Sequence, residues 1–209
     1  MNQDSKTHRR PVTPALAFLA MLGLLGGCAS PTTVADLMPE ASTSRVAAPK
    51  MPGSIAVRTS VPTGTTSPTY KTMEVSEWID SQKLKQAIEQ SIARDSMFSE
   101  VRQGNADYLL EVWIDKIQNV LDIAGEGFVF NFTSVWRLTR LQDGNVVVCE
   151  FVKGHGAARA MAARAYPPGI SAATRTMIEK GLVAISDQSQ SYLSAQSTAG
   201  TRPTIAAAQ

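Results

Sequence analysis

The stretch VWRLTRLQDGNVVVCEF, from Val135 to Phe151, sets the expected arrangement of the sheet in this protein. Apolar and polar residues alternate over its first part, as they do in a strand that is buried on one face. Asp143-Gly144 follows, a dipeptide that favours the two-residue turn of a β-hairpin. Such a turn pairs Gln142 with Asn145, and every later pair keeps the same sum of residue numbers.

The resulting register brings chemically matched side chains together across the hairpin. Its pairs are Trp136 with Phe151, Leu138 with Cys149, and Arg137 with Glu150. Apolar side chains then meet on one face and opposite charges on the other, whereas a slip by one residue would exchange the two faces. We therefore predict that Cys149 is a small core residue beneath the helices rather than a reactive thiol.

Two segments extend this predicted antiparallel sheet. Residues 106–117, ADYLLEVWIDKI, alternate so that Tyr108 and Val112 point to the core, and residues 128–141 place Phe130 and Trp136 in the same way. The opposite positions form an outer sheet face. Its members are Leu109, Trp113, Val129, Val135, Val148 and Val152, among Glu111, Arg137 and Glu150.

Helical spacing appears on either side of these strands. A first strand is expected over residues 54–61, and residues 80–97 then predict an amphipathic helix that Asp80 or Ser81 can cap. A second helix is expected over residues 171–193, after Pro167-Pro168. The sequence therefore predicts an α+β fold, a two-layer sandwich with two helices on one face of a mostly antiparallel sheet of about four strands.

An apolar run of thirteen residues, Ala15 to Gly27, precedes Cys28. As a helix it would cover about 20 Å, too little for a hydrocarbon core of about 30 Å. Basic residues lie before it, and a Pro- and Thr-rich stretch follows, as in a secretory signal peptide. Leu25-Gly26-Gly27-Cys28 resembles the bacterial lipobox, which implies lipidation of Cys28 and membrane anchoring. In enterobacterial lipoproteins, Ala29 in place of Asp implies passage to the outer membrane, with the domain facing the periplasm, whereas other bacteria sort lipoproteins differently.

The composition of the remaining chain suggests a single domain with unstructured ends. We expect a lipoprotein signal peptide over residues 1–27, a disordered tether over residues 28–53, one α+β domain over residues 54–193 and a flexible tail over residues 194–209. Without the signal the chain carries seventeen basic and seventeen acidic side chains, which gives no basis for nucleic-acid binding. Only Cys149 then remains free, so no internal disulfide is expected.

Catalytic motifs are absent from the sequence. His155 is the only histidine outside the signal, and it lies between two glycines that suggest a surface turn. The chain has no Gly-x-Ser-x-Gly elbow, phosphate-binding loop, Rossmann glycine pattern or Cys-x-x-Cys pair. We therefore expect a protein that is not an enzyme and that uses no metal and no cofactor. The competing hypothesis is an envelope hydrolase in which Cys149 or a serine works with His155.

Two surfaces are candidates for partner binding. On the outer sheet face, Trp113, Leu109 and Arg137 combine apolar area with charge, although the segment 118–127 or the tether could equally cover this face. The second candidate is GAARAMAARAYPPG, residues 156–169, in which Arg159 and Arg164 stand among alanines. This segment could contact a partner or an anionic surface, or simply connect two elements.

The order of the elements, with SMFSEV ending the first helix and ADYLLEVWI opening the next strand, resembles small Gram-negative envelope lipoproteins. That group includes LPS-assembly, ABC-transport auxiliary, curli-secretion and penicillin-binding-protein activator lipoproteins. The resemblance implies a noncatalytic accessory role in which the lipoprotein binds a larger envelope machine. It rests on element order and on the Ala106-Asp107-Tyr108 strand opening, and it does not distinguish among these members.

The leading hypothesis is therefore a lipid-anchored adapter, facing the periplasm, that binds and positions an envelope assembly or transport complex. The alternative is a self-assembling lipoprotein component of a secretion system, a homo-oligomer with rings as the extreme case. The two differ in whether exposed strand edges and Trp113 meet another protein or another copy of this chain.

Overall fold

The structure is a computed structural model that describes residues 32–48, 50–61, 79–122, 127–158 and 166–199. The chain divides into two units, Met1–Ser30 and Pro31–Gln209. All described residues belong to the second unit, so the architecture below is that of this unit alone. The expected signal peptide and Cys28 lie outside the described residues.

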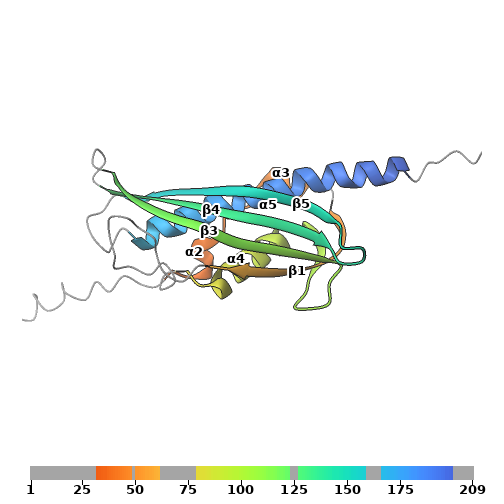
Figure 1. Ribbon diagram of the computed structural model, residues 1–209, viewed down its shortest axis with the longest axis horizontal. Coiled ribbons are helices and arrows are strands. Elements are labelled where there is room, and N and C mark those ends of the chain that lie inside the picture. The colour runs from red at the N-terminus through yellow and green to blue at the C-terminus, as the bar shows by residue number, and fades with distance from the viewer. Residues whose placement is uncertain (1–31, 49, 62–78, 123–126, 159–165, 200–209) are drawn as a thin grey trace, which may run out of the picture. The chain divides into compact units, whose positions relative to one another are not determined.

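The described part is built around a five-stranded mixed sheet with strand order β2-β1-β3-β4-β5 (Figure 1). β1 pairs in parallel with β2 and β3, and the pairs β3–β4 and β4–β5 are antiparallel. The strands are β1 Met51–Ser60, β2 Phe98–Val101, β3 Tyr108–Asp122, β4 Gly127–Arg140 and β5 Val146–Ala158. The sheet therefore has one strand more than expected, and half of its strand pairs are parallel.

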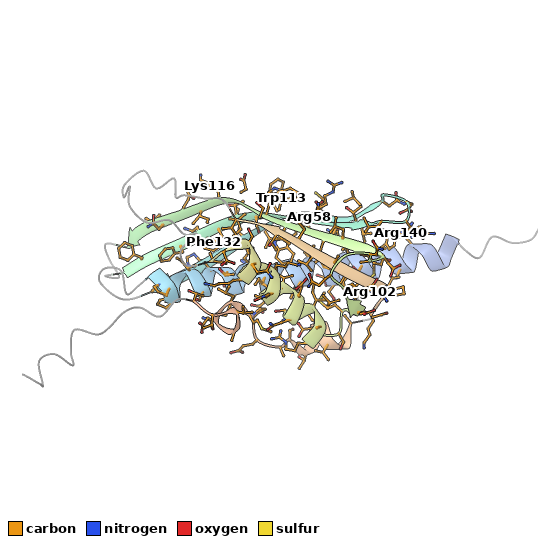
Figure 2. The ribbon with its side chains drawn as sticks, turned by 90° about the horizontal axis from the view of Figure 1, so that it is seen from below. Arg58, Arg102, Trp113, Lys116, Phe132 and Arg140 are labelled. Atoms are coloured by element: carbon orange, nitrogen blue, oxygen red, sulfur yellow. The ribbon has the colours of Figure 1, made fainter. Side chains whose placement is uncertain are left out.

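The described helices lie on one face of this sheet (Figure 2). They are α2 Val34–Leu37, α3 Thr43–Ala47, α4 Ser81–Arg94 and α5 Tyr166–Ala199. α4 packs on β1 and β2, α5 packs on β5 and β4, and α2 contacts both long helices. The expected α+β class, with helices on one side of a sheet, is confirmed at this level.

Local sequence signals explain α4 and the inner face of β3. The Asp80 side chain accepts a hydrogen bond of 2.6 Å from the backbone N–H of Lys83, which is the predicted helix cap. The predicted apolar stripe of the helix and the predicted inward side chains of the strand are all buried: Leu84, Ile88, Ile92, Tyr108, Leu110, Val112 and Ile114. Burial of these two sets forms the part of the core beneath β1 and β3.

The end of α4 differs from the expectation because the chain reverses direction there. α4 ends at Arg94, and Ser96 adopts a left-handed conformation with φ of 52°. Phe98–Val101 then forms β2, parallel to β1, instead of closing the helix. Phe98 lies against Tyr108 with ring centroids 5.6 Å apart, so an aromatic contact between β2 and β3, the strands on either side of β1, helps to fix this short strand.

The register of the β4–β5 hairpin also differs from the expected one. Arg140 and Asn145 close a four-residue loop, because the Arg140 N–H donates to the Asn145 carbonyl over 2.8 Å. The Arg140 guanidinium also binds the Asp143 carboxylate, and this hydrogen bond is the main reason why the pKa of Asp143 falls to about 2. The side chain of Asp143 thus holds a longer loop than the two-residue turn that its sequence favours.

This change exchanges the two faces of β5. Trp136 pairs with Glu150, Arg137 with Cys149 and Val135 with Phe151, and a register shift follows Leu138. Val148 and Val152, predicted to face outward, are buried with exposed fractions of 1% and 5%. Phe151 is 72% exposed, and Cys149 is also exposed. The predictions that Cys149 belongs to the core and that Arg137 meets Glu150 are therefore wrong.

Close contact between α5 and the sheet accounts for the observed register. A Cβ atom on Gly156 would lie 2.3 Å from the backbone nitrogen of Ala173, and one on Gly181 would lie 2.4 Å from the Trp136 ring. Glycine at these positions lets the helix approach the strands, and it lets Trp136 pack with no exposed surface. The small residues of β5 must therefore face α5, which turns Phe151 outward.

α5 is longer at both ends than the predicted helix. It includes Pro167 and Pro168 in its first turn, where proline fits because the N–H groups there have no partner within the helix. It also continues to Ala199, through the first residues of the expected tail, whereas residues 200–209 lie outside the described part. The predicted apolar stripe is retained, with Ile178, Leu182 and Ile185 buried.

Residues 32–48, expected to be a disordered tether, are folded and pack on the helix layer; we call them the strap. Leu37 joins the core with no exposed surface. The Arg45 guanidinium donates to the Asp95 carboxylate over 2.7 Å, and the exposed fractions of these two side chains are 1% and 0%. The composition of the strap suggested disorder, but a few buried contacts with distant residues order it.

Candidate binding surface

The sheet face opposite the helices is not covered by any element in the described part of the chain (Figure 2). Cross-strand pairing aligns Trp113 of β3 with Val135 of β4 and with Phe151 of β5. Trp113 is 36% exposed and Phe151 is 72% exposed, whereas Val135 between them is 7% exposed. We call this apolar line of three residues the aromatic row.

Cations flank the aromatic row on both sides. On one side Arg58, Glu111 and Arg137 are neighbours across β1, β3 and β4. Glu111 lies 3.2 Å from Arg58 and 4.0 Å from Arg137, so a single carboxylate is shared by two guanidinium groups. On the other side Lys116, Thr133 and Lys153 are aligned. The row therefore lies between two positively charged borders.

The structure brings together three of the five predicted partner-binding residues. Trp113, Leu109 and Arg137 lie on this outer face, with Leu109 half-buried and Arg137 exposed. Arg159 and Arg164 lie outside the described residues, as does Cys28. Of the two predicted covers of the face, residues 118–122 belong to β3, and the strap packs on the opposite side of the sheet.

Sequence reasoning missed Phe151, the most exposed aromatic residue of this surface. Its position depends on the extra residue that the register shift introduces between Val146 and Val148. A signal was present in Gly154 and Gly156. Both glycines alternate in phase with Val152, so the three residues lie on one face of the strand. The glycines have no side chains, which leaves space on that face for a helix, and Phe151 falls on the opposite face.

The arrangement of Cys149 and His155 does not form a nucleophile–base pair. Both side chains are exposed on β5, and they are separated by six residues, or about 20 Å along an extended strand. The His155 ring instead lies 3.0 Å from the amide oxygen of Asn131. Within the described ranges, no group of three or more potential ligands is placed to hold a metal ion.

Asp107, in the Ala-Asp-Tyr strand opening, accepts hydrogen bonds from the backbone N–H of Ser54 at 2.7 Å and from its hydroxyl at 2.8 Å. These bonds lower the pKa of Asp107 and tie β1 to the start of β3, which is a structural role.

Among the helices described, none combines the length and apolarity needed to cross a membrane.

Comparison by sequence identifies no relative. No family model matches the chain, and no curated protein matches it.

Solved structures are similar to the chain in fold. Protein XCC0632 of Xanthomonas campestris, described as a DUF330 protein, aligns with a TM-score of 0.56 and 14% identity over 78% of this chain and 97% of that one. The hypothetical protein CT253 of Chlamydia trachomatis aligns with a TM-score of 0.50 and 8% identity over 68% of this chain and 99% of that one. These two similarities show a shared fold.

A protein of Caulobacter crescentus described as a lipoprotein is also similar, with a TM-score of 0.41 and 17% identity over 70% of this chain and 93% of that one. This lower score carries no argument about the fold or the role of the present chain. The comparisons thus show a fold shared with the Xanthomonas and Chlamydia proteins and no individual family.

Proposed function

We propose that this protein is a lipid-anchored adapter of the cell envelope that binds a partner protein through its outer sheet face and performs no catalysis. The observation that carries the proposal is the aromatic row. Phe151 and Trp113 expose large apolar side chains on either side of Val135, on a sheet face that the described elements leave open. Clustered exposed aromatic residues are typical of the centre of a protein interface.

The charges around the row indicate the chemistry of the partner. Arg58, Arg137, Lys116 and Lys153 border it, whereas Glu111 is already shared between two arginines. A complementary surface has an apolar centre with carboxylates on both sides, because opposite potentials steer association and define the orientation of the complex. We therefore expect an acidic protein surface as the partner, and not a nucleic acid.

The anchor is the lipid that the sequence predicts on Cys28. Its attachment would place the domain on the periplasmic side of the outer membrane, where an adapter can meet envelope complexes. Replacing Cys28 with Ser should prevent lipid attachment and leave the precursor uncleaved. Mass spectrometry of the purified protein measures both effects, and normal processing with membrane recovery of the variant would contradict the anchor.

The binding surface can be tested by photo-crosslinking in living cells. A photoreactive amino acid at Phe151 should crosslink to an acidic envelope protein, whereas the same group at Val183 on α5 should not. Val183 is a matched control because it is also an exposed apolar residue, at 37%, but lies on the helix layer. Adducts at both positions, or at neither, would oppose the proposed surface.

The identity of the crosslinked protein also distinguishes the adapter hypothesis from the self-assembly hypothesis. A crosslink from Phe151 to a different protein supports the adapter, and a crosslink to a second copy of this chain supports the self-assembling alternative. Phe151→Ser should abolish the specific adduct formed from a photoreactive group at Trp113, because it removes the more exposed of the two aromatic side chains. Val183→Ser should leave that adduct unchanged.

A further inference from the structure

The strap runs beside α5 from the beginning of that helix toward its middle. Pro39 and Glu40 lie beside Ala172 and Thr176, whereas Arg45 lies beside Ile185 and Ser189. The strap and α5 therefore run in the same direction along one another. Figure 1 shows the same order, with α2 toward the start of α5 and α3 farther along the helix.

Several buried contacts hold the strap in this position. Beyond the Arg45–Asp95 ion pair, Arg45 Nη2 donates to the Glu40 carbonyl over 2.9 Å, and Arg94 Nη1 donates to the Pro39 carbonyl over 2.6 Å. Burial opposes the charge on Asp95, but hydrogen bonds from Arg94 and Arg45 outweigh it and lower the pKa of Asp95. The strap is thus a fixed part of the domain.

The fixed strap leaves little free chain between the predicted anchor and the domain. Only residues 29–31 separate Cys28 from Thr32, a span of at most about 14 Å when fully extended. By contrast, the 34 residues of α5 extend over about 51 Å, since each helical residue adds about 1.5 Å. The linker is therefore much shorter than the domain it attaches.

The end of the domain toward α2 contains the start of α5 and the end of β5, together with the end of β3 and the start of β4. A Cβ atom on Gly169 would lie 2.5 Å from the Phe130 ring and 3.4 Å from Ala158, which shows that these elements meet. We call this region the hairpin end. The opposite end carries the β4–β5 loop at residues 141–144, beside the later part of α5, where Arg140 lies over the Tyr192 ring.

The outer side of the hairpin end has a composition that suits a lipid surface. Val120 is 55% exposed, and Lys116 and Lys153 are exposed along the same face. Among the described residues of this region, Asp115 is the exposed carboxylate. The helix layer instead exposes carboxylates and cations together, such as Glu179 and Lys180. Lysine and apolar side chains favour contact with anionic headgroups.

We propose that the strap holds the hairpin end against the bilayer, so that the β4–β5 loop points away from it and the outer sheet face stands beside the membrane surface. This inference rests on the proposed lipidation of Cys28. The partner that reaches the aromatic row is then a membrane-embedded or membrane-bound protein, because a fully soluble partner would have no need of a domain held so close.

The orientation can be measured by energy transfer from the protein to acceptor-labelled lipids. Full-length protein, matured in cells, is purified and reconstituted into phosphatidylethanolamine–phosphatidylglycerol vesicles. In a Cys149→Ser background, a donor dye is attached to Val120→Cys at the hairpin end or to Gln142→Cys in the β4–β5 loop. These sites are separated by about 36 Å along the strands, so transfer should be at least about threefold more efficient from Val120→Cys.

A matched control lengthens the linker without touching the domain. Inserting a flexible Gly/Ser segment of about 30 residues between Ser30 and Pro31 should make the two transfer efficiencies similar, since such a chain reaches about 30 Å on average. Equal transfer from the two sites without the insertion, or stronger transfer from Gln142→Cys, would overturn the proposed orientation.

Mass spectrometry of the same sample distinguishes failure of the inference from failure of the anchor. If Cys28 carries lipid and the two sites transfer equally, the orientation is wrong and the anchor stands. If Cys28 carries no lipid, the proposed anchor fails and the orientation that rests on it fails with it.

Discussion

The two faces of the sheet are built from the same strands but behave differently. The face toward the helices buries Trp136, Phe130 and Leu138 with no exposed surface, and it makes contacts close enough to require glycine in α5. The opposite face keeps Phe151 and Trp113 partly in solvent between rows of charged residues. The first face holds the domain together, and the second is available for binding.

The difference shows that the face of the strand on which an aromatic residue lies decides whether its side chain is buried or exposed. Trp136 and Trp113 have the same side chain, but Trp136 is enclosed and its indole N–H donates to the Ser134 hydroxyl over 3.0 Å. Trp113 lies on the other face, directly opposite Val135. Substitutions on the two faces should therefore separate stability from binding, and the following predictions test that separation in order of decreasing effect.

Trp136→Ala should cause the largest loss of stability. It removes a side chain with no exposed surface and leaves a cavity beneath Gly181, so the free energy of unfolding should fall by about 3 to 5 kcal/mol. Trp113→Ala should cost clearly less, because this side chain is already 36% exposed. Denaturant unfolding of the two variants measures this contrast, and similar losses would mean that the outer face is also part of a core.

The buried Asp95 carboxylate should produce the next largest effect. Asp95→Asn leaves Arg45 buried without its charged partner, which should cost about 3 kcal/mol at pH 7. Because folding lowers the pKa of Asp95, its contribution is present above the ordinary value of 3.8 and is lost as the pH falls through the lower folded value. The stability difference between wild type and variant should therefore shrink as the pH falls from 6 to 3. A constant difference would contradict the ion pair.

The register of β5 can be tested with two neighbouring positions. Val148→Ala should cost about 2 kcal/mol, since it removes buried methyl groups, whereas Phe151→Ala should change stability by less than about 0.5 kcal/mol. The two-residue turn suggested by the sequence would give the opposite order. Thermal unfolding of both variants therefore distinguishes the two registers.

The smallest effect is expected for the exposed ion pairs of the outer face. Glu111→Gln removes the carboxylate shared by Arg58 and Arg137, whose side chains are 71% and 44% exposed. Solvent screens such pairs, so the stability should change by at most about 1 kcal/mol. The association rate with the partner should rise, because the variant makes the border of the aromatic row more positive. An unchanged rate would oppose an acidic partner.

Local periodicity was sufficient to predict the elements whose burial follows from neighbouring residues. The Asp80 cap and the spacing of Leu84, Ile88 and Ile92 identify α4, and alternation from Tyr108 identifies the inner side of β3. For the candidate surface, the same alternation placed Trp113, Leu109 and Arg137 outside. These assignments depend on one element at a time, which is why the sequence alone supports them.

Features set by contacts between distant residues were not predictable in this way. β2 depends on the reversal at Ser96 and on the contact between Phe98 and Tyr108, and the strap depends on the pairing of Arg45 with Asp95. The orientation of Phe151 depends on a one-residue shift that close packing against α5 favours. Propensity carries no information about such pairings, since each is decided after the elements meet.

The reactivity of Cys149 tests the central claim most directly, because this native thiol is exposed on the outer sheet face next to Phe151. Its rate of alkylation by a small neutral maleimide is measured in the purified protein, in isolated native envelopes and in urea-unfolded protein. The account predicts rapid labelling of the purified protein, close to the unfolded rate, and strong protection in envelopes where the partner covers the face. Slow labelling of the purified protein would place Cys149 in a core, and equal rapid labelling in purified protein and envelopes would contradict a partner bound to this surface.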